Sequence, residues 1–224
     1  MKKVCIFFIL IVSNIGLFAG NENGQTLIHN GLTYDLVTSP YTGKVWLDRN
    51  LGATQVCQSF DDKACYGDYF QWGRGADGHE KANSDTTSSI SDSTTPTHSK
   101  FIISNNYRYD WLKYEDDSLW SGVNASNNPC PKGFKVPTIN ELKAETLDRG
   151  VKNRDEAFEN FLKLPSAGGR YDSDGSQYDQ GSNGSVWSSS PKYLSSWYLY
   201  FTSDNANAYD NNRANGHSVR CLKD

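Results

Sequence analysis

Apolar and polar positions near the start of the chain follow the pattern of short strands. Residues 32–37 and 44–47 are runs rich in β-branched and aromatic side chains, and the turn-forming residues Ser39, Pro40 and Gly43 lie between them. This arrangement predicts a β-hairpin.

A second alternating stretch lies near the C-terminus. Trp197, Leu199 and Phe201 are apolar, and Tyr198 and Tyr200 fall between them. Because successive side chains of a strand point to opposite faces, we expect the three apolar residues to face inward and the two tyrosines to face outward.

The clearest helix signal follows residue 137. Thr138 and Glu141 have the spacing of a capping box, in which each side chain caps the other residue's backbone N–H. Gly150 is a typical C-terminal stop. The sequence therefore predicts a helix over residues 139–149.

A second helix is predicted after Asn153, which has Glu156 three residues later. Pro165 ends it. Three apolar residues at helical spacing would form its buried face: Phe158, Phe161 and Leu162.

These elements follow in the order strands, loops, two helices and strands. This order predicts an α+β fold, with two helices, a small twisted antiparallel sheet and long loops.

Residues 84–99 contain eleven Ser or Thr, which predicts a surface excursion. The aromatic residues of 107–120 allow two interpretations, a binding stripe or a long loop packed onto the core.

The N-terminus has the pattern of a secretory signal peptide. Lys2 and Lys3 precede an apolar run over residues 4–12, and Ala19 is the expected cleavage site. A membrane anchor is the alternative, but the run is shorter than the roughly 20 apolar residues that a span needs. We expect a short linker over 20–26, one domain over 27–224, no membrane span in the mature chain, and export to the periplasm, the cell surface or the medium.

Four cysteines remain after removal of the leader: Cys57, Cys65, Cys130 and Cys221. An even number in an exported chain implies disulfides, and four cysteines allow three connectivities. The close spacing of Cys57 and Cys65 favours a local loop and leaves Cys130 with Cys221. No Cys-x-x-Cys pair suggests zinc.

Composition excludes some functions. A net charge of −4 and a pI near 5.6 do not suit a nucleic-acid partner, which needs a basic face. A mean hydropathy of −0.66 with 13% aromatic residues describes a compact core under a polar, aromatic-rich surface.

No motif predicts a catalytic residue, a cofactor or a metal. Asp172, Asp174 and Asp179 approach the pattern of a calcium loop without meeting its full spacing, so a solvated turn is expected and a structural calcium stays open. The four histidines lack metal-ligand spacing, and the chain contains no nucleophile elbow or phosphate loop.

Six short motifs occur in the order and spacing of a known family: Asn50-Leu51, Tyr69 with Trp72-Gly73, residues 130–138, Gly168-Gly169-Arg170, Val186-Trp187-Ser188-Ser189, and residues 216–221. Through them residues 27–224 resemble the Fibrobacter succinogenes major paralogous domain. The resemblance implies a C-type-lectin-like fold, in the branch related to formylglycine-generating enzymes. It also supports the pairing of Cys130 with Cys221.

The resemblance does not transfer an activity, because function belongs to a site and not to a fold. The enzyme branch needs reactive cysteines, and here they are accounted for as bridges. The calcium-binding motifs of sugar-binding lectins are absent. We expect a non-catalytic module that binds a protein or a glycan. An exported enzyme of the formylglycine-generating-like branch and a structural envelope protein are the alternatives.

The stretch over residues 193–217 also resembles the variable segment of diversity-generating retroelement target proteins, in which Asn codons change at adenines. An ordinary polar loop is the alternative explanation. Tyr, Asn and Ser are typical of recognition loops, so the tail is the expected binding site. Its expected ligand-binding residues are Tyr198, Tyr200, Thr202, Ser203, Asp204, Asn205, Asn207, Tyr209, Asp210, Asn211, Asn212, Asn215 and His217.

Overall fold

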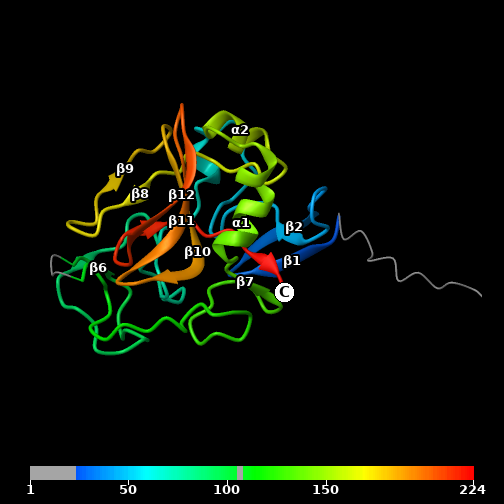
Figure 1. The fold of residues 1–224 in the computed structure, drawn as a ribbon. Coiled ribbons are helices and arrows are strands. Elements are labelled where there is room, and N and C mark those ends of the chain that lie inside the picture. The colour runs from blue at the N-terminus through cyan, green and yellow to red at the C-terminus, as the bar shows by residue number, and fades with distance from the viewer. Residues whose placement is uncertain (1–23, 105–107) are drawn as a thin grey trace, which may run out of the picture.

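The computed structural model describes residues 24–104 and 108–224, and these residues form mostly β-structure (Figure 1). They contain fourteen strands in four sheets. The helices α1 (Ile139–Glu145) and α2 (Arg154–Glu159) have only 7 and 6 residues. The expected α+β fold of the C-type-lectin-like kind, with two helices and a small sheet, is therefore wrong. The expected signal peptide over residues 1–19 and Tyr107 lie outside the described residues.

The largest sheet has the strand order β1-β2-β3-β14-β7 and is antiparallel. Its strands are β1 (Thr26–His29), β2 (Leu32–Thr38), β3 (Val45–Leu47), β14 (Leu222–Lys223) and β7 (Phe134–Lys135). The pairing of β2 with β3 confirms the predicted hairpin. The last strand of the chain thus lies between an early hairpin and a segment from its middle.

A second antiparallel sheet consists of β10 (Gly184–Lys192), β11 (Ser195–Phe201) and β12 (Ala206–Asn212). β11 and β12 pair without interruption, whereas the pairing of β10 with β11 has an irregularity between Trp187 and Pro191. β11 is the central strand, so both of its edges are hydrogen-bonded to neighbouring strands.

Beside this sheet lies a third one, in the order β4-β13-β8-β9. Its strands are β4 (Phe70–Gln71), β13 (Gly216–His217), β8 (Gly169–Arg170) and β9 (Gln177–Tyr178). Figure 1 shows the β8–β9 arm next to β12. Pairing of β13 with β8 places this arm beside the C-terminal segment.

The predicted Ser/Thr-rich excursion forms little regular structure. β5 (Thr86–Thr87) pairs in parallel with β6 (Phe101–Ile102), and most side chains between them are exposed or half-buried. Of the aromatic residues after it, Trp111 and Trp120 are buried, whereas Tyr114 is exposed. The loop therefore packs onto the core through its tryptophans.

Helix α1 begins as predicted and ends early. Thr138 and Glu141 form the capping box. The backbone of Thr146 leaves the helical region, with φ −126° and ψ −84°, and a separate 3-10 helix, η2 (Leu147–Arg149), follows. Gly150 then ends the segment with φ +90°, as the sequence indicates.

Helix α2 is also shorter than its apolar pattern predicts. Asn153 accepts a hydrogen bond from the backbone N–H of Glu156 and caps the helix. Its end at Asn160 leaves Phe161 outside the helix, half-buried, while Leu162 is fully buried. The cap is confirmed, but the predicted face is only partly helical.

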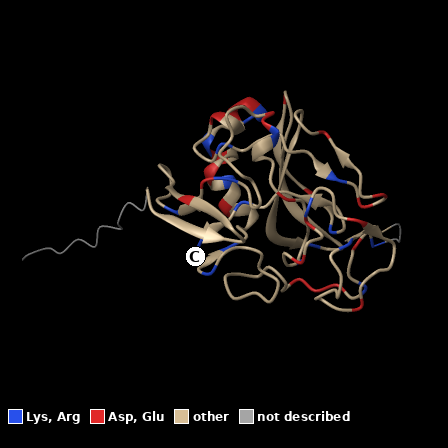
Figure 2. Ribbon diagram, turned by 180° about the vertical axis from the view of Figure 1, so that it is seen from behind, with Lys and Arg blue, Asp and Glu red and all other residues tan. Residues whose placement is uncertain are grey.

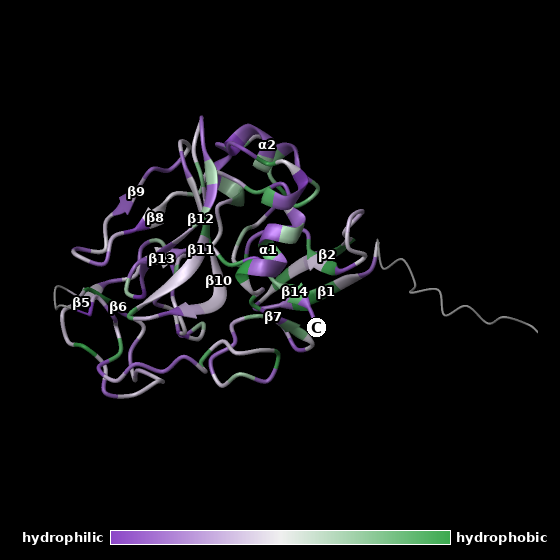
Figure 3. Cartoon of the chain, in the orientation of Figure 1, coloured by the Kyte–Doolittle hydropathy of each residue, from purple (hydrophilic) through white to green (hydrophobic). Residues whose placement is uncertain are grey.

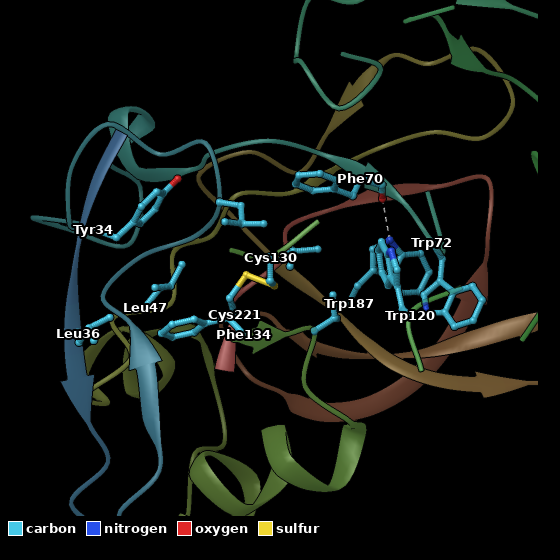
Figure 4. Close-up of a cluster of buried hydrophobic side chains, with 13 residues drawn as sticks. Tyr34, Leu36, Leu47, Phe70, Trp72, Trp120, Cys130, Phe134, Trp187 and Cys221 are labelled. Carbon is cyan, nitrogen blue, oxygen red and sulfur yellow. Dashed lines mark hydrogen bonds between the residues drawn. A yellow bond between two sulfur atoms is a disulfide. The ribbon is translucent and has the colours of Figure 1, made fainter. Parts of the chain in front are cut away.

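The main core surrounds a disulfide between Cys130 and Cys221 (Figure 4). Trp187 donates from Nε1 to the carbonyl of Phe70 at 2.8 Å, and Trp72 donates to the carbonyl of Ser188 at 2.7 Å. Since a buried indole N–H needs a partner, these bonds fix the two rings and link β4 to β10.

A second disulfide joins Cys57 and Cys65 and closes a loop that contains the 3-10 helix η1 (Lys63–Cys65). Both expected cysteine pairings are thus present.

Within the described ranges, no helix combines the length and the apolar character needed to cross a bilayer. Figure 3 shows hydrophobic positions gathered near α1 and β14, and hydrophilic ones along β9.

Candidate ligand-binding face

The two faces of the β10–β11–β12 sheet differ in chemistry. Leu199 and Phe201 are fully buried in a cluster with Val186 and with Leu142 of α1, which confirms their expected inward orientation. Trp197 is only half-buried, and the Lys192 ammonium lies 4.5 Å from its ring centroid. This face therefore closes the core under α1.

The opposite face of the sheet carries three tyrosines. Tyr198 lies directly across from Tyr209 in the pairing of β11 with β12, and Tyr200 is two residues further along β11. The ring centroid of Tyr200 is 5.9 Å from that of Tyr198 and 6.2 Å from that of Tyr209. Tyr209 is 41% exposed, and the other two are half-buried.

Two further tyrosines reach this face from the β8–β9 arm. Tyr171 stacks on Tyr178, with ring centroids 4.2 Å apart. Tyr178 contacts His217, and His217 in turn stacks on Tyr198 at 5.0 Å. We call the five side chains, from two distant segments, the tyrosine face: Tyr171, Tyr178, Tyr198, Tyr200 and Tyr209.

Sequence reasoning missed Tyr171 and Tyr178 because they precede the polar tail. The two glycines before them are the only local signal. Gly168 has φ +65°, and a Cβ there would lie 1.9 Å from the carbonyl oxygen of Tyr178; a Cβ at Gly169 would lie 2.6 Å from the Tyr178 hydroxyl. Only glycine allows the arm to close this tightly.

Side-chain amides hold the tyrosine hydroxyls. Asn183 donates from Nδ2 to the hydroxyl of Tyr200 at 3.0 Å and to the carboxylate of Asp179 at 2.7 Å. Asn205 donates to the hydroxyl of Tyr209 at 3.1 Å. The face thus has fixed rings with amide and carboxylate groups at its rim.

Other members of the expected site surround the β11–β12 turn. Thr202 donates to the carboxylate of Asp204 at 2.8 Å, and Ser203, Asp204 and Asn207 are exposed. Asp210 lies across from Trp197 and so belongs to the other face of the sheet. It forms an ion pair with Lys192 there.

The last members of the expected site face the interior. Asn215 is 5% exposed, and His217 is not exposed. Asn211 donates to Nε2 of His217 at 3.0 Å, and Asn212 donates to the carboxylate of Asp172 at 2.7 Å. Asn211 and Asn212 are half-buried. These four residues join β12 and β13 to the β8–β9 arm, so the exposed members of the expected set end at Asp210.

Burial disfavours the charged forms of the inner aromatic groups, Tyr178, Tyr198, Tyr200 and His217. It raises the pKa of Tyr178 and of Tyr198 well above the usual phenol range, and the neighbouring tyrosines add to this effect. For Tyr200, burial and then the Asp179 carboxylate raise the pKa. Burial lowers the pKa of His217 to about 3. Tyr178, Tyr198, Tyr200 and His217 are therefore neutral at physiological pH.

One other cluster has metal-ligand residue types. Asp77, His79 and Glu80 bring ligand atoms within 4.8 Å of one another. However, Nδ1 of His79 bonds to Asp77 at 2.8 Å, Nε2 accepts from the backbone N–H of Gln71 at 3.1 Å, and Glu80 accepts from the N–H of Gly78 at 2.8 Å. Both ring nitrogens are committed, so this donor set does not fit a metal and instead closes a buried turn.

Of the comparisons of this chain with known proteins, only the one with family models finds a match. No curated protein and no solved structure matches the chain significantly. A family model described as a domain of unknown function, DUF8237, matches residues 54–222. The matched part is most of the chain and includes both disulfides and the tyrosine face. The chain therefore belongs to the DUF8237 family.

Proposed function

We propose that the protein is an exported, non-catalytic binding module whose tyrosine face contacts a protein or glycan ligand. The convergence of rings from β8–β9 and β11–β12 is the observation that carries this proposal. Tyrosine supplies rigid contact area together with a hydrogen-bonding hydroxyl, and such residues dominate the binding energy of many interfaces.

Export is supported by the two disulfides. Such bonds persist in oxidising compartments such as the periplasm and the extracellular space. The hydrogen-bonded amides at the rim support recognition because they hold the hydroxyls of Tyr200 and Tyr209 in place before a ligand arrives. A preorganised surface loses less entropy on binding.

The test removes the rings that are accessible and spares those that pack on the core. Tyr171→Ala, Tyr200→Ala and Tyr209→Ala are combined in one variant. Tyr198 is kept because it packs against Trp187. Wild type is screened on glycan and extracellular-protein arrays, and the affinity of the variant for each hit is then measured. We expect binding to fall by at least about 100-fold with little change in Tm, since two or more anchor rings are lost.

A matched control removes three exposed tyrosines outside the face. Tyr41, Tyr114 and Tyr193 are 46%, 64% and 85% exposed. Their combined replacement by Ala should leave the same affinities within about twofold, because substitutions far from the contact surface have small effects. Equal losses in the two triple variants, or unfolding of the first, would contradict the assignment of binding to the tyrosine face.

A further inference from the structure

We propose that the ligand of the tyrosine face is a cationic segment of a protein partner, which presents arginine or lysine side chains to the rings and to Asp179. This inference rests on the proposed function and specifies the chemistry of its partner. Three features of the described residues carry it: the charge of the face, the position of Asp179 and the inclination of the rings.

The segments that form the face are acidic. Residues 171–212 contain five Asp and one basic residue, Lys192. Lys192 forms an ion pair with Asp210 on the other side of the sheet. Asp172 is buried and accepts a hydrogen bond from Asn212. The exposed carboxylates that remain belong to Asp174, Asp179 and Asp204.

Neighbouring arginines do not neutralise this charge. The Arg170 guanidinium lies 4.1 Å from the ring centroid of Phe101 and donates to the hydroxyl of Ser84 at 2.7 Å. Arg154 stacks on Phe60 at 4.4 Å and donates to a backbone carbonyl. Figure 2 shows acidic positions recurring along the β8–β9 arm. Among the described residues, Asp179 forms no ion pair with Lys or Arg.

Asp179 is held beside the rings by its neighbours. Its carboxylate shares the amide of Asn183 with the hydroxyl of Tyr200. Its φ of +55° lies in the left-handed region, which aspartate and asparagine adopt more readily than other residues with a side chain. Asp179 is therefore an exposed carboxylate beside the rings, held in place by the amide of Asn183 and without a cationic partner among the described residues.

The three rings on β11 and β12 do not form a flat platform, whereas Tyr171 and Tyr178 stack on each other with an interplanar angle of 23°. The planes of Tyr198 and Tyr200 are inclined by 55°, and those of Tyr200 and Tyr209 by 67°. A sugar chain that stacks on several aromatic rings at once needs rings whose faces lie in one plane. A compact cation needs only the accessible electron-rich face of a single ring, and a nearby carboxylate adds to that attraction.

The experiment uses two labelled peptides of equal length. One is a Gly/Arg repeat, and the other has citrulline in place of every arginine, which keeps the shape and removes the charge. Fluorescence anisotropy measures their binding to the purified protein. We expect the citrulline peptide to bind at least about tenfold more weakly. Raising the salt from roughly 0.05 M to roughly 0.5 M should weaken binding of the arginine peptide, because the rim carboxylates are exposed.

Three variants assign the binding to the face. Asp179→Asn keeps the left-handed backbone favourable and removes the charge, so the arginine peptide should bind about fivefold more weakly. Asp148→Asn, in the exposed 3-10 helix η2, removes the same charge elsewhere and should leave affinity unchanged. The triple variant of Tyr171, Tyr200 and Tyr209 should lose binding of the arginine peptide.

Other results would overturn the inference. Equal binding of the two peptides, or equal binding of the arginine peptide to wild type and to the triple tyrosine variant, contradicts a cationic ligand on this face. If a neutral glycan binds through the tyrosine face and the arginine peptide does not, the proposed function stands and the cationic partner is wrong. If neither peptides nor glycans nor array proteins depend on the face, both proposals fail.

Discussion

At the scale of single residues, His217 links the core to the tyrosine face. Its ring centroid lies 5.0 Å from that of Tyr198 and 4.4 Å from that of Trp187. Its Nε2 accepts a hydrogen bond from Asn211. Because desolvation penalises the charged imidazolium, burial lowers the pKa of His217 to about 3. A neutral ring at this position lets Tyr198 stack without a buried charge.

This burial predicts a loss of stability in acid. In the unfolded chain His217 has a pKa of about 6.5, so between about pH 6.5 and pH 3 the unfolded state binds a proton that the folded state does not. Stability therefore falls as the pH drops through this window, by about 2 kcal/mol at pH 5 from His217 alone. Urea unfolding at pH 7 and pH 5 measures this loss of stability, and an NMR titration of the His217 ring measures its pKa.

Two other buried groups act in the same pH range. Burial lowers the pKa of His79 to about 4, which adds to the acid destabilisation. Burial raises the pKa of Asp110 to about 6, so the folded state takes up a proton there first, and this group adds stability as the pH falls from about 6 to about 4. NMR titration of the two histidine rings and of the Asp110 carboxyl group separates the three contributions. A His217 ring that titrates near pH 6.5 would contradict its burial.

At the scale of elements, the β8–β9 arm decides whether the tyrosine face forms. The arm carries Tyr171 and Tyr178, and it closes through Gly168 and Gly169. It is held to the rest of the molecule by the pairing of β8 with β13, which involves Gly216. A local change in the arm should therefore affect binding as well as stability.

The variant Gly168→Ala tests this dependence. Its Cβ would lie 1.9 Å from the Tyr178 carbonyl oxygen, and its φ of +65° strains any other residue. We expect a loss of about 2–3 kcal/mol, from the clash and the backbone strain together, and a loss of ligand binding. Urea unfolding and amide exchange in β9 measure the two effects.

Gly43→Ala provides the matched control. Gly43 also has a positive φ, +72°, but no atom lies within 4 Å of the position of its Cβ. Only the backbone strain remains, so the expected loss is about 1 kcal/mol with binding retained. Equal losses in the two variants would mean that the close approach to Tyr178 has no energetic role.

At the scale of the whole molecule, the Cys130–Cys221 bridge (Figure 4) holds the end of the chain beside residue 130, next to β14, which lies between β3 and β7 in the largest sheet. The bridge spans 91 residues, whereas Cys57 and Cys65 are 8 apart. Constraint of the unfolded chain grows with loop length. The long bridge should therefore contribute more to the stability of the fold than the short one.

Replacing each pair by alanine measures the difference. Loss of the long bridge should cost about 4–5 kcal/mol of the free energy of unfolding, and loss of the short one about 2–3 kcal/mol. Urea unfolding of the two double variants provides the comparison. A short-bridge variant that is destabilised as much as the long-bridge variant would contradict the loop-length argument.

The candidate site was predictable only in part. Strand alternation placed Tyr198 and Tyr200 opposite Leu199 and Phe201 correctly, because alternation is a local rule. It could not show that the chain turns inward after Asp210.

Retroelement diversification of the tail stays a prediction, and a near-copy of the coding segment that differs only at adenines would establish it. Such variation would be tolerated best at the exposed positions up to Asp210.

The sequence by itself determined the early hairpin, the caps of both helices, the local cysteine loop and the alternation along β11. Each of these depends on neighbours within a few residues. Only the tertiary structure decided that the molecule is mostly β and that Tyr171 and Tyr178 join the tail in one face. The strands responsible, β4, β8 and β13, have two residues each and pair across long sequence separations. Two residues cannot show a period, so their pairing is decided by the packing of the whole chain.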